Sequence, residues 1–387
     1  MDFVCLKDDL VFGVKLASYA LGTRSSMPIL AGIKMEIEGD ALRIYATDLE
    51  RAIHCELPIE NRAGNESVVL NGAVLSRIAS RLPADNRISL RTGSEDGTLV
   101  KLQCGESSFD LLTLPVEDYP DVAPLPQSKI GTLDVGLFHR GIEQTVFAAL
   151  RAGETTRLNL TGVNMVLKQG SLKLVATNGY RLSLKEIAAD EVLAEQEYLI
   201  DASVLTDLDR VLSQLDSDKV HLHKGEGEVF FHTGGVTFMA KTIAEEFPDF
   251  EQVIPQDNQI GLFFERRALL ETLQRIEITA AEESGAATIQ VSSEESAVRI
   301  NSSSADKGEA MERVRLKKVP SQDIEVSFKA EYLIDALKRM NSDEVVLWLT
   351  DSEKAGLFEP YGENIPQEDQ GFLYVCMPVR ISGRSND

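Results

Sequence analysis

The sequence predicts an α+β protein of three similar domains, each with two helices packed on antiparallel strands. Its 387 residues fit three domains of about 130 residues, close to the commonest domain size. A set of residues recurs at a displacement of 130: Leu30, Gly32, Met35, Leu42, Ala46 and Thr47 return as Leu160, Gly162, Met165, Leu172, Ala176 and Thr177. A repeat of this length indicates that a whole domain has been copied.

The third copy is fainter than the other two. The helical pattern at 332–337 falls where the pattern at 204–208 would recur, and Tyr119-Pro120-Asp121 returns as Phe247-Pro248-Asp249. We therefore expect domains at residues 1–128, 129–256 and 257–387.

The first domain shows the order of elements most clearly. A helical pattern over 8–24 is followed by two alternating strands at 33–37 and 42–45, which Gly39 and Asp40 join in a tight turn. A second helix over 73–82 has one apolar face and places Arg77 and Arg81 on the other. Three more strands are expected around 88–90, 100–102 and 109–111.

The other two domains repeat this order. The second has helices at 136–151 and 203–215 and strands within 163–184 and 219–240. The third has helices at 266–283 and 331–340 and strands within 288–301 and 344–358.

Composition indicates a soluble globular protein, with 43% hydrophobic and 26% charged residues. No apolar run approaches the ~18 residues of a membrane helix. The four cysteines are scattered, which favours reduced thiols in the cytosol over disulfides. We expect no cofactor, since no nucleotide, nucleophile or zinc motif is present.

The net charge of −23 argues against nucleic acid at first. However, the six expected helices contain 12 Lys and Arg against 11 Asp and Glu, so the acidic excess lies in strands and loops. An acidic body with less acidic helices is typical of a protein that meets DNA along one surface. A merely solvated helix face is the alternative.

Five segments together resemble one family: Ala46–Glu50, Leu112–Pro115, Val175–Leu182, Phe247–Phe250 and Tyr374–Arg380. They resemble the bacterial DNA polymerase III β subunit, the sliding clamp, in order and spacing from Met1 to about Ile381. The resemblance is most specific at 177–182 and at 377–380. It implies the DNA clamp fold and a head-to-tail homodimer that closes a ring of six domains, with helices lining the hole.

The resemblance also implies which arginines reach DNA, namely Arg24, Arg77, Arg81 and Arg157. Local signals leave alternatives open. Arg24 could cap a helix C-terminus, and Arg77 and Arg81 could belong to a solvated surface. Glu154 stands where the family more often has a neutral side chain.

By the same resemblance, a cleft between the second and third domains binds partner peptides. Its expected residues are Leu160, Thr177, Gly179, Tyr180, Arg181, Leu182, Pro248, Val253, Val375, Met377, Pro378, Val379 and Arg380. Aliphatic and Met side chains suit an adaptable apolar groove. Alternatively, Val375, Met377 and Val379 are core residues of the last strand, although Pro378 favours an edge. Asn178 and Tyr180 replace the Asp and His of many relatives.

Phe109, Leu111 and Ile278 match the interface positions of the family, and Thr279 stands where a larger apolar residue is common. The implied partners are double-stranded DNA without sequence preference, a second copy of the chain, the polymerase III α subunit, the clamp loader, and other polymerases and repair proteins with clamp-binding peptides. We expect a cytoplasmic, nucleoid-associated protein with no membrane contact.

Two other classes of function remain as alternatives. One is a multidomain enzyme with an acidic active site at a domain junction, and the other is a scaffold that oligomerises without encircling anything. His221, His223 and His232 could suggest a metal, but no Cys or carboxylate stands at ligand spacing. The loop 359–370 and the tail 382–387 extend beyond what the family needs.

Overall fold

The computed structural model describes residues 1–22, 27–64, 66–83, 87–93, 97–282 and 284–380. The chain forms two compact units. The first unit comprises residues 1–135, 190–194 and 203–242, and the second comprises 136–189, 195–202 and 243–387. Both are α+β with antiparallel strand pairing, as predicted. The domain boundaries at 128 and 256 remain predictions.

The first unit contains helix α1 (Lys7–Ala17), helix α2 (Gly72–Ala79) and most of helix α4 (Ala202–Leu212). Its strands are β1 (Asp2–Leu6), β2 (Gly32–Glu38), β3 (Ala41–Thr47), β4 (Arg51–Pro58), β5 (Glu60–Ala63), β6 (Ser67–Asn71), β7 (Arg87–Thr92), β8 (Leu99–Cys104), β9 (Ser107–Leu114), β10 (Lys129–Asp134), β15 (Lys219–Lys224), β16 (Glu228–Thr233) and β17 (Val236–Lys241). A continuous sheet runs β6-β2-β3-β4-β17-β16-β15-β10. The turn at Gly39 and Asp40 is confirmed, because Glu38 pairs with Ala41.

The second unit contains most of helix α3 (Val135–Glu143), helix α5 (Arg266–Glu277) and helix α6 (Ala330–Lys338). Its strands are β11 (Gly162–Lys168), β12 (Ser171–Thr177), most of β13 (Arg181–Val192), β14 (Gln196–Asp201), β18 (Ile260–Glu265), β19 (Ala286–Val291), β20 (Ala297–Ser304), β21 (Gly308–Arg315), β22 (Ile324–Lys329), β23 (Glu344–Leu349), β24 (Gly356–Tyr361) and β25 (Phe372–Cys376). One sheet runs β14-β11-β12-β13-β25-β24-β23-β18, and β21-β20-β19-β22 form another.

Within each unit a pair of helices packs together, α1 with α2 and α5 with α6. Asn71 caps α2 by accepting the Val74 amide at 3.0 Å. Buried Leu269, Leu273, Leu333 and Leu337 join α5 and α6 to the core of the third repeat. Apolar helix faces are thus buried against sheets, as their periodicity predicts.

The first helix of each repeat is shorter than predicted. The pattern over 8–24 forms α1 only to Ala17, that over 136–151 ends as α3 at Glu143, and that over 266–283 ends as α5 at Glu277. Ser18 and Thr145 bond back to carbonyls of the preceding turn, at 2.6 Å to Lys15 and 2.7 Å to Gly141. Such bonds compete with helix continuation, so apolar spacing alone overestimates length.

The repeat is visible where helix and sheet approach most closely. A Cβ on Gly13 of α1 would lie 2.8 Å from Ile44 Cδ1, and a Cβ on Gly141 of α3 would lie 2.6 Å from Leu174 Cδ1. Ile44 and Leu174 occupy equivalent positions of β3 and β12. Glycine is therefore used at both positions because the backbone of each helix lies close to the sheet.

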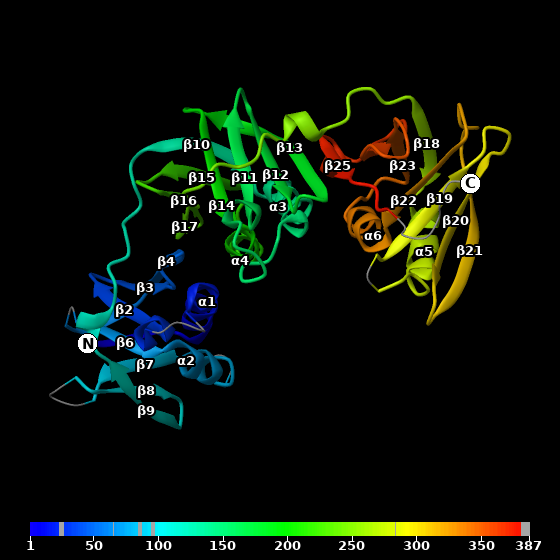
Figure 1. Ribbon diagram of the computed structural model, residues 1–387. Coiled ribbons are helices and arrows are strands. Elements are labelled where there is room, and N and C mark those ends of the chain that lie inside the picture. Colours follow the sequence, from blue (N-terminus) through cyan, green and yellow to red (C-terminus); the bar gives the residue numbers. More distant parts are fainter. Residues whose placement is uncertain (23–26, 65, 84–86, 94–96, 283, 381–387) are drawn as a thin grey trace. The chain divides into compact units, whose positions relative to one another are not determined.

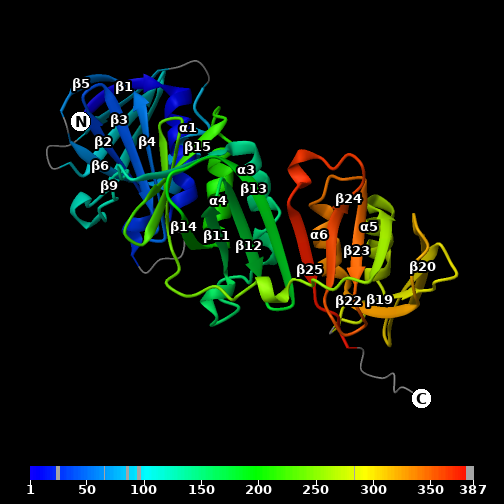
Figure 2. The ribbon, with the colours of Figure 1, turned by 90° about the horizontal axis from the view of Figure 1, so that it is seen from above.

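Each unit also contains a strand pair that joins distant parts of the sequence. We call these two strand pairs seams. The first seam pairs β4 with β17 (Figure 1), and the second seam pairs β13 with β25 (Figures 1 and 2). Their registers are equivalent: Arg51 faces Ala240 in the first seam and Arg181 faces Cys376 in the second.

The same ion pair fixes each seam to a helix. Arg51 pairs with Asp207 on α4, and Arg181 Nη1 pairs with Asp335 Oδ2 on α6 at 2.8 Å. In both seams a Thr hydroxyl holds the preceding turn by donating to the arginine carbonyl, at 2.8 Å from Thr47 and 2.7 Å from Thr177. The seam and its ion pair are therefore repeated along the chain, as the domain is.

We predict that Asp335→Ala lowers the free energy of unfolding of the second unit by about 2–3 kcal/mol. The Arg181 side chain is only 10% exposed and would lose its counter-charge. The loss should fall below the ~3–5 kcal/mol typical of a fully buried pair, because Asp335 is still 27% exposed. Urea unfolding measures the change. Glu271→Ala, which removes the exposed partner of Arg267, should leave stability nearly unchanged; equal effects of the two variants would contradict the prediction.

Candidate functional site

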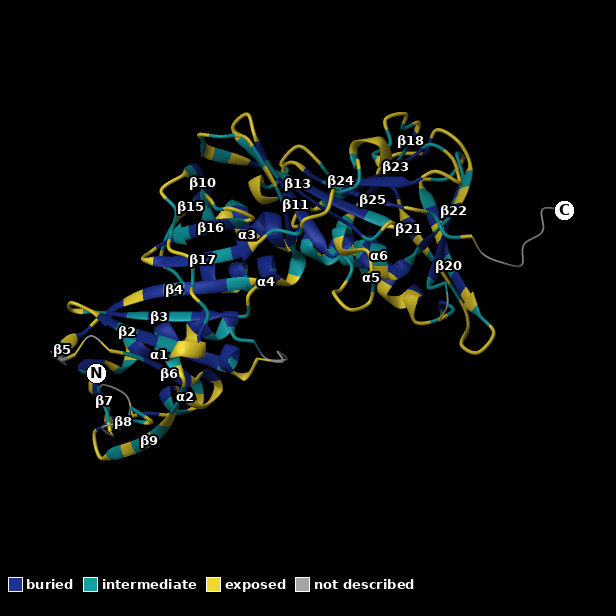
Figure 3. Ribbon diagram, turned by 60° about the vertical axis from the view of Figure 1, so that its left-hand side comes forward, coloured by how far each residue is buried: buried dark blue, intermediate teal, exposed yellow. Residues whose placement is uncertain are grey.

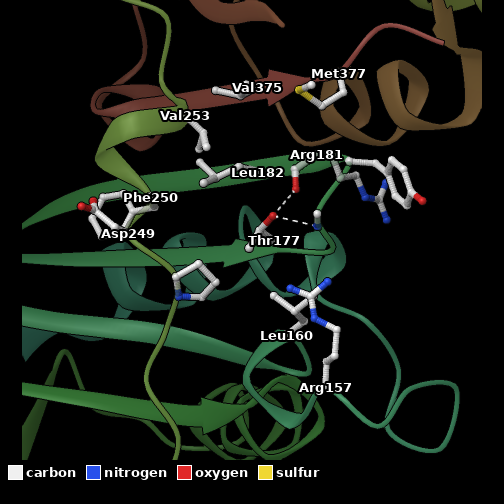
Figure 4. Close-up of a pocket in the computed structure, with 13 residues that line it drawn as sticks. Arg157, Leu160, Thr177, Arg181, Leu182, Asp249, Phe250, Val253, Val375 and Met377 are labelled. Carbon is white, nitrogen blue, oxygen red and sulfur yellow. Dashed lines mark hydrogen bonds between the residues drawn. The ribbon is translucent and has the colours of Figure 1, made fainter. Parts of the chain in front are cut away.

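A pocket of about 150 Å³ lies in the second unit beside the second seam (Figure 4). It is lined by Arg157, Leu160, Thr177, Gly179, Tyr180, Arg181, Leu182, Pro248, Asp249, Phe250, Val253, Val375 and Met377. These residues come from four separate stretches of sequence, two of which are brought together by the pairing of β13 with β25.

The pocket has an apolar floor and exposed apolar rims. Leu160, Leu182 on β13 and Val375 on β25 are buried and form the floor. Val253, in the short turn Glu251–Val253, and Met377, just after β25, are 51% and 43% exposed. Solvent-exposed apolar side chains around an apolar hollow are typical of a surface that binds a partner.

The turn before β13 shapes one side of the pocket. The Thr177 hydroxyl accepts the Gly179 amide at 3.1 Å, and Asn178 Oδ1 accepts the amides of Tyr180 and Arg181 at 2.9 and 3.0 Å. Gly179 has φ = +89°, a conformation that favours glycine. The turn leaves the Tyr180 side chain 67% exposed at the rim.

Arg181 lines the pocket but its guanidinium is engaged elsewhere. It stacks over the ring of Tyr332 at 4.4 Å and pairs with Asp335. Burial alone would lower the pKa of this guanidinium, but Tyr374 and Asp335 outweigh burial and hold the pKa above its usual value. Arg181 is therefore a fixed positive charge that anchors the seam.

The first seam provides an internal comparison, because its backbone is equivalent and its side chains are not. The Lys241 amide donates to the Glu50 carbonyl at 2.9 Å, and the Met377 amide donates to the Tyr180 carbonyl at 2.8 Å. In the first seam the side chains at these positions form an ion pair, Lys241 Nζ to Glu50 Oε1 at 3.2 Å. The exposed apolar rim is thus a property of the second seam and not of the repeated fold.

The structure gathers ten of the thirteen residues predicted for the cleft around this pocket. Pro378, Val379 and Arg380 do not line it. The expected strand through Val379 is wrong, since β25 ends at Cys376. The Val379 amide donates to the Ser327 carbonyl at 2.8 Å, which directs the chain toward β22. Val375 is both a core residue and part of the pocket floor.

Asp249 and Phe250 line the pocket although the sequence analysis did not assign them to it. A signal was present, because both lie in the segment Phe247–Phe250 that resembles the family. Arg157, predicted for the DNA surface, also lines the pocket.

The other predicted residues fall in three places. Arg24 lies outside the described residues. Arg77 and Arg81 line a groove of about 320 Å³ between α2 and β9, together with Phe109. Leu111 is on β9, half-buried, and Ile278 follows the end of α5 and is 69% exposed.

The three histidines lie on the neighbouring strands β15 and β16. In the part of the chain that the structure describes, no three His, Cys, Asp or Glu side chains are grouped as metal ligands. His221 and His232 face each other across β15 and β16.

No helix within the described ranges is long and apolar enough to cross a membrane.

Comparison with known proteins gives the family. Three models of the DNA polymerase III beta subunit match in succession: the N-terminal domain at residues 1–123, the central domain at 132–249 and the C-terminal domain at 251–380. The chain belongs to the DNA polymerase III beta subunit family. This family is the beta sliding clamp, a non-catalytic processivity factor, so the alternative of an enzyme is excluded.

Individual relatives agree over their whole length. A beta sliding clamp from Staphylococcus aureus is 26% identical, with 98% of this chain and 99% of the relative covered, and one from Pseudomonas putida is 28% identical, with 98% and 100% covered. The crystal structure of the Thermotoga maritima beta subunit has a TM-score of 0.88 at 26% identity, covering 98% of this chain and 100% of that one. The crystal structure of the DNA polymerase III subunit beta from Pseudomonas aeruginosa has a TM-score of 0.90 at the same identity and coverage.

Proposed function

We propose that two copies of this chain close head to tail into a ring around duplex DNA, and that the pocket at the second seam binds short peptides of replication and repair proteins. The observation that supports the peptide site best is the contrast between the seams. Equivalent backbones hold an ion pair in the first seam and exposed Tyr180 and Met377 in the second. An apolar rim of this kind is costly to leave in water unless a partner covers it.

The pocket suits an extended peptide with two apolar anchors. Leu182, Val253 and Val375 offer an aliphatic hollow, and Met377 can adjust its shape to a Leu or Phe side chain. Burying each anchor contributes about 1.5–3 kcal/mol, and ordering of the peptide offsets part of this. We therefore expect micromolar affinity. The DNA polymerase III α subunit, the clamp loader and other polymerases are the partners that the family implies.

We predict that Tyr180→Glu combined with Met377→Lys abolishes peptide binding and leaves the fold intact. The two substitutions copy the ion pair that Glu50 and Lys241 form at the first seam. Fluorescence anisotropy with a labelled pentapeptide that starts with Gln and ends with Leu-Phe measures the affinity. Glu50→Tyr with Lys241→Met, the reciprocal change at the first seam, is the matched control and should bind normally. Unchanged affinity of the first double variant would remove the pocket from the proposal.

Two strand edges that the chain leaves open support the proposed dimer. Among the described residues, β9 pairs fully with β8 but meets β6 only at Thr113 and Leu114, and β21 pairs only with β20. No residue of β9 is fully buried, whereas the first-seam strands β4 and β17 are largely buried (Figure 3). β9 is equivalent to β17, and β21 is equivalent to β13, so β9 of one copy can pair with β21 of another as in the seams.

The groove beside β9 extends this interface. Arg77 on α2 occupies the position of Asp207 on α4, the residue that accepts the seam arginine. Asp306, in the turn before β21, and Glu309, the second residue of β21, flank the point where the seam strands begin with Arg51 and Arg181. We therefore assign Arg77 to the subunit interface, with its ion pair inverted relative to the seams. Phe109, Leu111 and Ile278 supply apolar contacts.

We predict that Leu111→Lys yields monomers in sedimentation velocity runs, because it places a charge on the open edge of β9. Lys101→Leu, on the neighbouring strand β8 and paired with Asp110, should stay dimeric. A dimer of unchanged affinity in Leu111→Lys would place the interface elsewhere.

DNA contact is proposed to be diffuse and sequence-independent. Arg24, Arg81 and Arg157 are the candidates, and Arg157 could serve both DNA and the pocket rim. A ring needs only phosphate attraction, because topology and not base contact keeps it on DNA. The protein would then act in the cytoplasm at the nucleoid.

We predict that the loaded protein stays on circular duplex DNA at moderate salt and leaves after one cut. A clamp loader and a nicked plasmid load the protein, gel filtration separates the complex, and a restriction enzyme linearises the plasmid. Retention on linear DNA with free ends would contradict encirclement. Replacing Arg24 and Arg81 with Glu should lower loading while peptide binding is unchanged.

A further inference from the structure

The second seam contains a buried polar cluster that the first seam lacks. Asp369 is completely buried in the connection between β24 and β25. Its Oδ1 accepts Arg140 Nη2 at 3.0 Å and Gln144 Nε2 at 2.9 Å. Its Oδ2 accepts the backbone amides of Asn341 at 2.6 Å and Ser342 at 2.7 Å. One carboxylate therefore joins the α3 region, the segment after α6 and its own connection.

Lys185 holds the same connection from the seam itself. This residue of β13 is 1% exposed, and its Nζ donates to the carbonyls of Glu368 at 2.7 Å and Gln370 at 2.6 Å. Lys185 also faces Phe372, the first residue of β25, across the seam. The point where β25 begins is thus fixed by the Lys185 ammonium and the Asp369 carboxylate.

The first repeat shows that the fold does not require this cluster. Gly13 of α1 and Gly141 of α3 occupy equivalent positions in the first and second repeats. Phe12 therefore corresponds to Arg140, and Leu16 corresponds to Gln144. When the registers of the two seams are aligned, Cys55 of β4 corresponds to Lys185 of β13. The first seam therefore uses an apolar set where the second uses two cations and an amide.

The connections to the seam strands differ in the same way. β16 turns into β17 through Gly234 and Gly235 alone, whereas residues 362–371 separate β24 from β25. The longer connection supplies Asp369. Buried ion pairs seldom add net stability over apolar residues of similar size, but they can specify one arrangement of the elements they join.

We propose that Asp369, Arg140, Gln144 and Lys185 form a positioning cluster that sets the register and spacing of β13 and β25, and thereby the shape of the peptide pocket. One end of each strand lies at the pocket. These are the start of β13, at Arg181 and Leu182, and the last part of β25, which leads through Val375 to Met377. None of the four cluster residues lines the pocket. The proposal rests on the proposed peptide site.

Asp369→Asn tests the cluster because it keeps the shape of the side chain and removes its charge. Arg140 then keeps only the partly exposed Glu143 as an ion-pair partner, and Lys185 loses the stronger of the two carboxylate charges that act on it. We expect affinity for the labelled pentapeptide to fall roughly five- to twentyfold, within the range typical of coupling between sites. Glu363→Gln, which removes an exposed charge from the same connection, should bind as wild type.

A second control separates positioning from general loss of stability. Ile300→Ala removes a buried side chain from the core of the third repeat, away from the pocket residues. At a temperature below the unfolding transitions of Ile300→Ala and Asp369→Asn, the Ile300→Ala variant should bind the peptide normally despite its lower melting temperature. If Asp369→Asn weakens binding no more than Ile300→Ala, the cluster is structural only and the proposal is wrong.

The pH dependence of affinity gives an independent signature. Burial lowers the pKa of Lys185 to about 8. Asp369 and Glu368 act to raise this pKa, whereas Arg140 acts to lower it. Loss of the Asp369 charge lowers this pKa further, and the amine can then shed its charge as pH rises. The affinity deficit of Asp369→Asn should therefore shrink from pH ~6 to ~9, and Lys185→Met in that background should remove the pH dependence.

Each outcome has a distinct meaning. If wild type itself fails to bind the peptide, the proposed function fails. If wild type binds and Asp369→Asn binds equally well, only the positioning role fails. Should Asp369→Asn not fold, Gln144→Met removes one hydrogen bond to the carboxylate and should show a smaller loss of affinity; its absence would overturn the proposal.

Discussion

Edge-strand hydrogen bonding is the constraint on which the rest of this structure depends. A strand at the end of a sheet exposes a row of unpaired amides and carbonyls, and each repeat has such edges to satisfy. The chain solves this twice in the same way, by pairing β4 with β17 and β13 with β25. The register of each seam fixes the turn before β4 or β13. It also fixes the arginine that follows this turn and the helix whose aspartate pairs with the arginine.

The two seams show how one backbone can serve two purposes. At the first, Glu50 and Lys241 cover the seam end with an ion pair, and apolar Leu16 and Cys55 fill its interior. At the second, the rim is apolar and exposed, and a buried polar cluster around Asp369 and Lys185 lies at the opposite end of the seam. The inversion is chemically consistent, because a pocket that must accept a ligand needs an open apolar rim and a fixed framework behind it.

The charge distribution follows from the same arrangement. Two basic residues of the helices are committed to ion pairs within the fold: Arg140 is buried against Asp369, and Arg275 pairs with Glu312 at 2.7 Å. An overall charge of −23 leaves few cations free for phosphate. Weak, diffuse DNA contact is what such a balance permits, and topology can supply the persistence that affinity does not.

The sequence by itself determined the repeat, the order of elements and the apolar faces, because periodicity reports which side of a helix or strand is buried. The resemblance added ten residues that do surround one pocket, seven of them within 177–182 and 374–380. Neither source located the ends of α1, α3 and α5, and at α1 and α3 a Ser or Thr hydroxyl bonds back to the preceding turn where apolar spacing predicts more helix. Only the tertiary structure brought Asp249 and Phe250 into the pocket, ended β25 before Met377, and placed Lys185 and Asp369 together. The Lys185 contact alone joins segments 185 residues apart. Local sequence patterns describe how a surface is buried but not which distant surface buries it.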